Sequence, residues 1–407
     1  MSEPAAPFRS IVQSPSLFIL VCITLSGTFP LHVFVPALPS AASDLHASTA
    51  GIGLTITLYV VGLSVGQLVY GPLSDRYGRR PVLLAGLSLF AVASVAAAFA
   101  PSLAGLECAR LAQALGGCSG LVLGRAIARD SSGSTTLIRR LATLSIAMAV
   151  ATAVAPIIGA QIVEHLGWRS IFSALSVVNV LVLFAVWLVV PETHSASRDF
   201  RMSRYLKSYL ALLRSPAFVT HSLGGASATT GIYAFLSASP FILESRLGLS
   251  TRAFGFAYFS LVVGLASGQS TAKRLAGRVS ARSALIVASL IMGAASISLL
   301  VSYWCDSLSV TSVVAPMIVM FFATGLSSPF AISSALDVDQ SVVGAAAGLY
   351  GCLQMGYGAL CTAAVGLSSS DPTASMIGAL LVSSAIAGFA FKAAPRAHVR
   401  ANQEPVA

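Results

Sequence analysis

The sequence predicts an all-α membrane protein whose twelve transmembrane helices form two pseudo-symmetric six-helix bundles, with the N and C termini cytoplasmic. Three observations carry this prediction: the composition, the placement of the basic residues between apolar runs, and an internal repeat. Of the 407 residues, 56% are hydrophobic and 9% are charged, and the mean hydropathy is +0.84. A soluble domain carries about 25% charged residues, so this chain cannot cover a water-facing surface. The composition therefore excludes an ordinary cytosolic enzyme and a disordered protein. It also excludes a nucleic-acid binder, because the net charge of +10 sits in short clusters between apolar runs.

Twelve apolar runs are long enough to cross a bilayer, since a spanning helix needs about 20 mainly apolar residues. Gly, Pro and Ser within several runs are tolerated in membrane helices and permit close helix packing. The first run is longer than the apolar region of a signal peptide, about 7–15 residues, so we expect it to be retained. The runs lie at 17–39, 50–72, 81–100, 102–125, 141–163, 169–190, 217–240, 252–272, 283–303, 310–332, 343–366 and 373–393.

The basic residues fall mainly on one side of the predicted membrane. With the N-terminus inside, 20 of the 24 Lys and Arg residues lie in cytoplasmic segments, and Arg110 lies within a span. Because Lys and Arg are enriched in cytoplasmic loops, this split predicts that both termini are cytoplasmic and that the number of spans is even. The residues expected outside are Arg169, Arg246 and Arg252. Those expected inside are Arg9, Arg76, Arg79, Arg80, Arg125, Arg129, Arg139, Arg140, Arg198, Arg201, Arg204, Lys207, Arg214, Lys273, Arg274, Arg278, Arg282, Lys392, Arg396 and Arg400.

The longest polar stretch, residues 191–216, lies at the middle of the chain and is basic. We interpret it as a cytoplasmic linker between an N-terminal bundle (1–190) and a C-terminal bundle with a short tail (217–407). A second interpretation is that its latter half forms an amphipathic helix on the inner leaflet.

An internal repeat supports two related halves. Residues 58–67 read LYVVGLSVGQ and residues 260–269 read SLVVGLASGQ, so six of ten positions agree at an offset of 202. The same offset aligns Arg76 with Arg278 and Arg80 with Arg282 in the basic loops that follow. A duplicated six-span half is what alternating access requires, because two similar bundles can rock about a central site.

The loop after the second span, GPLSDRYGRR at residues 71–80, combines glycines with an acid among arginines. Such charges at an inner helix end can form a network that latches one conformation. The loop resembles the signature of the major facilitator superfamily, Gly-x-Leu-x-Asp-Arg-x-Gly-Arg-Arg/Lys, and the resemblance implies that superfamily's fold. The matching residues are Gly71, Leu73, Asp75, Arg76, Gly78, Arg79 and Arg80.

The fourth span places Arg110 about two turns inside the membrane, where a charge costs a few kcal/mol and should face a cavity or a partner. Glu107 precedes it by three residues on the same helix face, so an ion pair between the two is an alternative to a functional role. Arg110, Gln113 and Gly116 resemble the superfamily's second motif, whose Arg is implied in proton coupling. Residues 125–130 look like the inner end of span 4 in the Bcr/CflA group of drug:proton antiporters.

The fifth span contains AVAPIIGA, residues 153–160. Pro156 should kink the helix, because proline donates no backbone hydrogen bond. Pro156 and Gly159 resemble part of the superfamily's antiporter motif, Gly-x-x-x-Gly-Pro-x-x-Gly. Ala151 and Ala155 stand where that motif has glycine, a departure that weakens the argument for antiport.

The first span ends in ValProAlaLeuPro, which is close to the Bcr/CflA pattern. In that group an acid usually stands four residues before the first Pro, where this chain has His32. Histidine can exchange a proton at physiological pH. We therefore expect His32, with Glu107 and Arg110, to form the proton-coupling site. The alternative is a neutral His32 hydrogen-bonded to a neighbouring helix, with coupling left to Glu107 or absent.

A mostly apolar cavity with few fixed charges is expected to bind an amphipathic or uncharged substrate. No catalytic constellation, nucleotide-binding Gly-rich loop or metal-ligand spacing is found, so we expect no enzyme activity, cofactor or metal site. Polar and aromatic candidates for the cavity wall are Tyr59, Gln113, Asn179, Tyr233, Phe235, Tyr258, Tyr350 and Gln354.

The resemblance implies a multi-pass protein of the cell inner membrane, expected to be a monomer. By alternating access it would exchange protons for small drug-like molecules such as chloramphenicol, bicyclomycin or sulfonamides. The alternative is a proton-coupled transporter of one metabolite, such as a purine nucleoside, an amino acid or a sugar. The sign of substrate-stimulated proton flux would separate antiport from symport.

Overall fold

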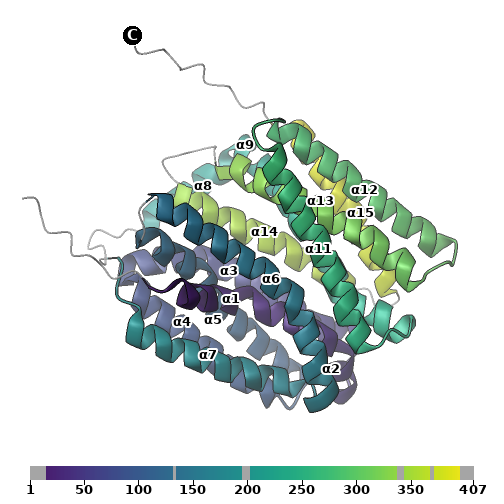
Figure 1. Ribbon diagram of the computed structural model, residues 1–407, viewed down its shortest axis with the longest axis horizontal. Helices are drawn as coiled ribbons and strands as arrows, with labels where there is room; N and C mark the ends of the chain where they lie inside the picture. Colours follow the sequence, from purple (N-terminus) through teal and green to yellow (C-terminus); the bar gives the residue numbers. More distant parts are fainter. Residues whose placement is uncertain (1–14, 132–133, 195–201, 337–342, 367–370, 395–407) are drawn as a thin grey trace, which may run out of the picture.

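The computed structural model describes residues 15–131, 134–194, 202–336, 343–366 and 371–394. Within these ranges the secondary structure is helical throughout, as the sequence predicts. Figure 1 shows the helices running side by side in two groups, with the purple-to-teal helices of the first half beside the green-to-yellow helices of the second. The ends of the chain, expected in the cytoplasm, and part of the predicted linker lie outside the described residues, with Arg9, Arg198, Arg201, Arg396 and Arg400.

The first half contains six long helical segments, here called rods, that match the first six predicted spans. Proline shapes the first rod, because Pro36 breaks it into α1, a short 3-10 turn and α2. Serine side chains accept a hydrogen bond from the first turn of α1, α3 and α5, which fixes where these helices begin. The elements are α1 (Leu17–Phe34), η1 (Val35–Ala37), α2 (Leu38–Asp44), α3 (Thr49–Tyr77), α4 (Arg79–Ala98), α5 (Leu103–Asp130), α6 (Ser134–Leu166) and α7 (Arg169–Val189).

The second half follows a separate short helix and again forms six rods. The first of these is composite, because α9 passes through a turn into α10 and then into a π-helical segment. The elements are α8 (Met202–Arg214), α9 (Pro216–Thr230), α10 (Tyr233–Pro240), η2 (Phe241–Arg246), α11 (Thr251–Leu275), α12 (Ala281–Trp304), α13 (Val310–Leu336), α14 (Val343–Gly366) and α15 (Pro372–Ala393).

Ten of the rods in the described ranges are long and apolar enough to cross a membrane. The two other predicted spans, 252–272 and 343–366, coincide with α11 and α14. Helix α11 has basic residues at both ends, and α14 is rich in glycine and alanine. Both lie against the opposite half of the protein, α14 beside α3 and α11 beside α6. These two helices therefore owe their place to contacts between the halves as well as to hydropathy.

The repeated segments pack in equivalent ways. Gly62 of α3 lies against α5, where an added Cβ would meet the Leu111 carbonyl oxygen at 2.9 Å. Its counterpart in the repeat, Gly264 of α11, lies against α13, where an added Cβ would meet the Ile318 carbonyl oxygen at 2.6 Å. In both halves a glycine is needed because the backbones of two helices approach closely. The predicted repeat thus corresponds to the same kind of close, glycine-mediated helix contact in both halves.

Polar contacts join the halves along α3 and α14. Ser64 donates a hydrogen bond to the Cys352 carbonyl oxygen at 2.8 Å, and Gln67 donates to the Gly351 carbonyl oxygen at 3.0 Å. Nearer the other end, the Thr57 hydroxyl donates to the Thr362 hydroxyl at 2.8 Å. These short side chains let the two helices run in contact along most of their length.

Candidate functional site

Arg110 lies inside the N-terminal bundle with an exposed fraction of 0%. Helix α5 brings it there because its glycine face packs closely: an added Cβ at Gly117 would meet the Ser26 carbonyl oxygen of α1 at 2.4 Å. The Arg110 Nη1 donates to the Gln113 side-chain oxygen at 2.7 Å and to the Pro30 carbonyl oxygen at 3.3 Å. The acceptors of this buried cation are therefore neutral.

Aromatic rings surround the rest of the Arg110 guanidinium. Its central carbon lies 4.1 Å from the ring centroid of Tyr59, 5.0 Å from that of Phe34 and 5.6 Å from that of Phe172. A desolvated cation over aromatic faces gains about 2 kcal/mol from each favourable contact. Nε and Nη2 of Arg110 have no hydrogen-bond partner in the described part of the chain. The rings thus offset part of the cost of burial, while two donors are still available to an acceptor.

The neighbours of Arg110 are held by their own hydrogen bonds. Gln113 donates to the Ser94 hydroxyl of α4 at 2.8 Å, which fixes the orientation of the amide that accepts from Arg110. Tyr59 donates to the Gly27 carbonyl oxygen of α1 at 2.8 Å. The arginine site is consequently preorganised by three helices besides its own.

Glu107 does not form the alternative ion pair with Arg110. Among the described residues no salt bridge or hydrogen bond joins the two, and the Glu107 side chain is half-buried one turn nearer the start of α5. The aromatic rings and neutral oxygens occupy the space around the guanidinium. Helix spacing left this pair open as an alternative, but spacing does not fix which way each side chain turns.

His32 joins the two halves of the protein. The side chain is buried in α1, and its Nδ1 lies 3.2 Å from the hydroxyl of Tyr258 on α11. Tyr258 in turn packs edge-on against Phe321 of α13, with ring centroids 6.2 Å apart. On α1, His32 stands two residues after Pro30, whose carbonyl accepts from Arg110. The structure therefore brings His32 and Arg110 to the same stretch of α1, and leaves Glu107 apart.

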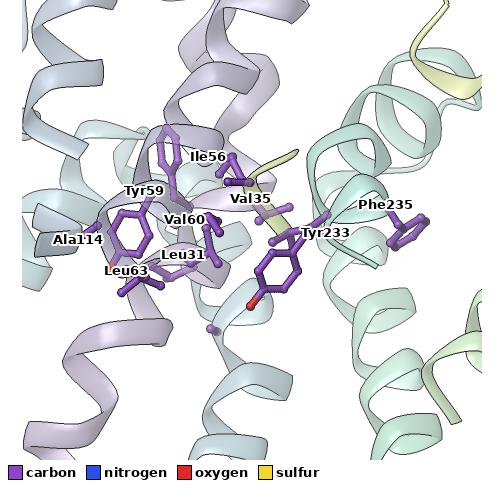
Figure 2. Packing of buried hydrophobic residues seen from close by; sticks show 14 of the residues in the cluster. Leu31, Val35, Ile56, Tyr59, Val60, Leu63, Ala114, Tyr233 and Phe235 are labelled. Atoms are coloured by element: carbon purple, nitrogen blue, oxygen red, sulfur yellow. The ribbon is translucent and has the colours of Figure 1, made fainter. Parts of the chain in front are cut away.

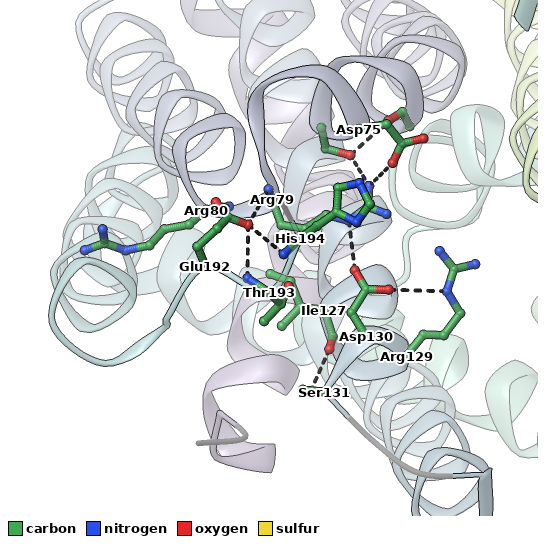
Figure 3. A network of polar contacts seen from close by, with 12 residues as sticks. Asp75, Arg79, Arg80, Ile127, Arg129, Asp130, Ser131, Glu192, Thr193 and His194 are labelled. Carbon is green, nitrogen blue, oxygen red and sulfur yellow. Dashed lines mark hydrogen bonds and ion pairs between the residues drawn. The ribbon is translucent and has the colours of Figure 1, made fainter. Parts of the chain in front are cut away.

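The predicted latch loop forms an ion network centred on Arg79 (Figure 3). Arg79 Nη1 lies 2.6 Å from an Asp75 carboxylate oxygen, and its Nε donates to Asp130 at the end of α5 at 3.0 Å. Arg79 also donates to the Ser74 hydroxyl. Although it is a basic residue at a helix end, Arg79 is only 5% exposed. The network ties together the cytoplasmic ends of α3, α4 and α5.

Glu192, after the end of α7, caps the start of α4. Its carboxylate accepts from the backbone N–H groups of Arg79 at 2.9 Å and Arg80 at 3.1 Å, and a carboxylate is favoured at a helix N-terminus. Gly78 has a φ of 97°, and a Cβ there would lie 2.6 Å from the Glu192 carboxylate. This position therefore requires glycine, whereas an added Cβ at Gly71 would have nothing within 4 Å.

The linker helix α8 also reaches the latch. The Tyr205 hydroxyl donates to an Asp75 carboxylate oxygen. Burial raises the pKa of Tyr205 above its ordinary range, and the hydrogen bond to Asp75 raises it further. Tyr209, one turn later, donates to the Leu68 carbonyl oxygen of α3 at 3.3 Å, and burial raises its pKa to about 12. Both phenols are therefore neutral donors at physiological pH.

The other predicted cavity residues occupy several places. Tyr233 points toward Leu31 and Val35 of the first half, while Phe235 points to the opposite side of its helix (Figure 2) and packs edge-on against Phe321. Gln354 donates to the Thr229 hydroxyl at 2.7 Å within the second half. The two remaining candidates are also buried: the Tyr350 hydroxyl has no partner among the described residues, and Asn179 donates to the Leu87 carbonyl oxygen between α7 and α4.

Pro156 and Gly159 lie where α6 meets the first rod. A Cβ at Gly159 would meet the Val33 carbonyl oxygen at 2.0 Å and Pro36 Cγ at 3.0 Å. Gly159 thus lets α6 approach the backbone of α1 closely beside His32. Pro156 lies inside α6, as expected.

Several site residues were not predicted from the sequence. Phe34 and Phe172 contact Arg110, but nothing in an apolar run distinguishes a phenylalanine beside a cation from one in the core. Asp130 and Glu192 complete the latch. Both carried a signal that could have been used, because each is an acid at the end of a long apolar run on the same predicted side as the arginines.

Comparisons with known proteins agree with this geometry. Residues 17–362 match the Major Facilitator Superfamily. The chain is 26% identical to the bicyclomycin resistance protein homolog of Haemophilus influenzae, over 92% of this chain and 96% of that protein. It is 29% identical to multidrug resistance protein D of Escherichia coli, over 84% of this chain and 86% of that protein.

Among solved structures, a bacterial homolog of the human lysosomal transporter Spinster, in an inward-facing and unoccupied conformation, superposes with a TM-score of 0.74. The sequences are 16% identical, and the match covers 96% of this chain and 98% of that one. At this identity the likeness concerns the fold alone, and it confirms the predicted fold class.

Proposed function

We propose, on the premise that the chain belongs to the Major Facilitator Superfamily, that it is a secondary transporter exporting small drug-like molecules in exchange for protons. The names of the two relatives, a bicyclomycin resistance protein homolog and a multidrug resistance protein, support this substrate class. We assign the protein to the cell inner membrane, where it moves its substrate without changing it chemically. We further assign the two bundles to residues 1–190 and 217–407, joined by 191–216.

The observation that carries the proposal is the buried contact between His32 and Tyr258. It is a hydrogen bond between the two halves, and one of its members is an imidazole, a group that can carry a proton. In the neutral form the Nδ1 of His32 either accepts from Tyr258 or donates to it. In the protonated form both ring nitrogens are donors, so Tyr258 must accept and its own proton must find another acceptor. A proton on His32 therefore changes a contact that holds the halves together.

Arg110 sets the electrostatic conditions for this exchange. Its charge lies against the same stretch of α1, and two of its N–H donors are unpartnered among the described residues. A substrate acceptor that enters beside the arginine gains two charge-assisted hydrogen bonds, each worth about 1.5–3 kcal/mol. A proton on His32 adds a second positive charge on the same stretch of α1, and the two like charges disfavour the arrangement in which His32 and Arg110 both lie there.

The cycle then follows from differential affinity. A proton arriving from outside and a substrate arriving from inside favour different arrangements of the two halves, so each drives release of the other. The latch of Asp75, Arg79 and Asp130 stabilises the arrangement in which the cytoplasmic ends of α3, α4 and α5 are held together. Energy comes only from the proton gradient in this scheme.

Proton-coupled transport in proteoliposomes tests the proposal. Vesicles carrying the purified chain and an internal pH dye are given chloramphenicol, bicyclomycin or a sulfonamide under an imposed pH gradient. We expect substrate accumulation to collapse with the gradient and substrate addition to move protons in the opposite direction. Proton movement in the same direction as the substrate would contradict exchange.

The variant His32→Asn tests the residue that carries the argument. Asparagine can hydrogen-bond with Tyr258 but does not titrate, so we expect gradient-driven accumulation to be lost while substrate binding persists. His221→Asn is the matched control, because His221 is a half-buried histidine of α9 whose Nδ1 lies 2.7 Å from the Ala217 carbonyl oxygen of its own helix. Unchanged proton coupling in His32→Asn would refute the role of His32.

A further inference from the structure

Helix α8 presents three different faces, and among the residues that the structure describes one of these faces is covered by the rest of the protein. The covered face consists of Tyr205, Tyr209 and Leu212. Tyr205 donates to Asp75, Tyr209 donates to the Leu68 carbonyl oxygen, and Leu212 is buried beside Phe218. These contacts fix the rotation of the helix about its axis at the ends of α3, α9 and α14 (Figure 1).

The second face is a stripe of leucines. Leu206, Leu210 and Leu213 follow one another at helical spacing and are 59%, 48% and 45% exposed. At about 100° per residue the stripe lies roughly 100° around the helix from the covered face. A leucine stripe so exposed on a short helix is costly in water, at about 25 cal/mol for each Å² of apolar surface.

The third face is basic. Lys207 and Arg214 are exposed, and they lie next to the leucine stripe on the side away from the covered face. The segment 195–216 contains five Lys or Arg residues and one acid, Asp199. Apolar and basic faces therefore stand side by side on a helix whose orientation the bundle fixes.

We propose that α8 is a binding site for anionic phospholipids of the inner leaflet. The bundle covers one face of α8. The leucine stripe, about 100° around the helix from that face, then meets the acyl chains of the lipid that surrounds the spans, and the basic face meets the headgroups. Leu206, Leu210 and Leu213 lie among acyl chains, and Lys207 and Arg214 bind phosphate. An interfacial helix is recognised by this combination of an apolar face and an adjacent basic face.

The basic residues of α8 favour an anionic phospholipid as the molecule that binds there. The cytoplasmic leaflet carries anionic headgroups, and a basic residue near that surface contributes about 1 kcal/mol of attraction. The next helix also exposes a leucine, Leu223 of α9. A soluble protein partner would compete with the bilayer for the same stripe, and the experiment below distinguishes the two.

Binding of α8 to lipid has a mechanical consequence. The helix that carries the leucines also carries Tyr205, the donor to the latch carboxylate of Asp75. A lipid that holds α8 at the interface therefore supports the Tyr205–Asp75 contact. Because this inference concerns the linker and the bilayer, it stands independently of which substrate is transported.

Photocrosslinking tests the site directly. The photoreactive residue p-benzoylphenylalanine is introduced at position 210 of the full chain, which is reconstituted in vesicles of equal phosphatidylcholine and phosphatidylglycerol. After irradiation, intact mass spectrometry identifies the adduct. We expect phospholipid adducts at position 210, with phosphatidylglycerol in excess. The matched control places the same residue at Ala211, which is exposed but rotated away from the stripe, and should give several-fold less adduct.

A charge variant tests the headgroup preference. In Lys207→Gln/Arg214→Gln we expect the excess of phosphatidylglycerol over phosphatidylcholine to fall by about fivefold for each basic residue removed, with total lipid adduct retained. If the photoreactive residue at 210 prevents folding, judged by size exclusion, position 206 on the same stripe serves instead. Equal adducts at 210 and 211, an unchanged headgroup preference in the charge variant, or crosslinking to a soluble protein in whole cells would overturn the proposal.

Discussion

Two buried arginines of the first half solve the same electrostatic problem differently. Arg79 is 5% exposed and lies between two carboxylates, Asp75 and Asp130. Arg110 is 0% exposed and lies among three aromatic rings, a carbonyl and an amide, with no carboxylate bonded to it in the described ranges. Burying a charge is costly unless it is paired or hydrogen-bonded, so the different partners indicate different roles.

An arginine paired with two carboxylates, such as Arg79, is suited to hold helices in one arrangement. An arginine with unused hydrogen-bond donors, such as Arg110, is suited to a site that binds an incoming acceptor. The carboxylates around Arg79 belong to the ends of α3 and α5, so the ion pairs stabilise one arrangement of these helices. Arg110 keeps two N–H donors without partners among the described residues, so an incoming acceptor can still change its energy. From this comparison we propose that Arg79 serves chiefly stability and Arg110 chiefly transport.

The largest effect is expected from Arg110→Ala. Removing the guanidinium should abolish gradient-driven transport in proteoliposomes, because the cation that we propose to meet the substrate is gone. Arg110→Lys should still lower transport about 10–100-fold, since an ammonium lacks the planar fork that reaches several acceptors at once. The exposed Arg252 of α11 provides the control, Arg252→Ala, which should transport normally. Normal substrate accumulation by Arg110→Ala would contradict the proposed role of Arg110 in transport.

Arg79→Ala should act mainly on stability. The substitution leaves Asp75 and Asp130 as partly buried carboxylates without their shared cation, and breaking a buried pair in this way costs about 3–5 kcal/mol. We expect a clear fall in the thermal unfolding temperature of the purified protein. Arg79→Lys should recover part of the loss. Equal unfolding temperatures for Arg79→Ala and the unaltered protein would contradict the structural role of this network.

The sequence was sufficient for the helices and for the presence of both arginines, and insufficient for their partners. Spans such as 373–393 and 169–190 coincide with helices to within a residue, because length and apolar content decide which segments lie in lipid. The latch was predicted because its acid and arginines are close in sequence. The partners of Arg110 come from α1, α3 and α7, and side-chain direction across helices leaves no periodic signal in an apolar run.

Glu107 illustrates the same limit. The i, i+3 spacing left an ion pair with Arg110 open as an alternative, yet the guanidinium contacts aromatic rings, the Pro30 carbonyl oxygen and the Gln113 side-chain oxygen. Helix spacing brings two side chains to one face, but the neighbouring helices decide where each one points. Asp130 and Glu192 show the reverse, because residues far apart in sequence meet only when α4, α5 and α7 pack together.

A smaller effect on stability is expected from Glu192→Ala. This substitution removes a helix cap beside the Arg79 network and leaves the ion pairs of Arg79 in place. The change removes the acceptor for two backbone N–H groups at the start of α4, and loss of such a cap costs about 1–2 kcal/mol. Thermal unfolding should shift accordingly, by less than in Arg79→Ala. Glu164→Ala, at an exposed position near the end of α6, is the control and should leave the unfolding temperature unchanged. If Glu192→Ala lowered the unfolding temperature as much as Arg79→Ala does, the stability of the network would depend on the cap and not on the ion pairs.

The smallest effect is expected from Glu107→Gln. Since Glu107 forms no ion pair with Arg110 among the described residues and its side chain is half-buried, the substitution should change the free energy of unfolding by no more than about 0.5 kcal/mol. Proton-coupled transport by Glu107→Gln, compared with His32→Asn in the same vesicles, then locates the titrating group. If Glu107→Gln loses coupling while His32→Asn keeps it, the proton is carried at the outer end of α5 and not between α1 and α11. That outcome would also reassign Arg110, because a carboxylate three residues away on the same helix would then have to approach it during the cycle.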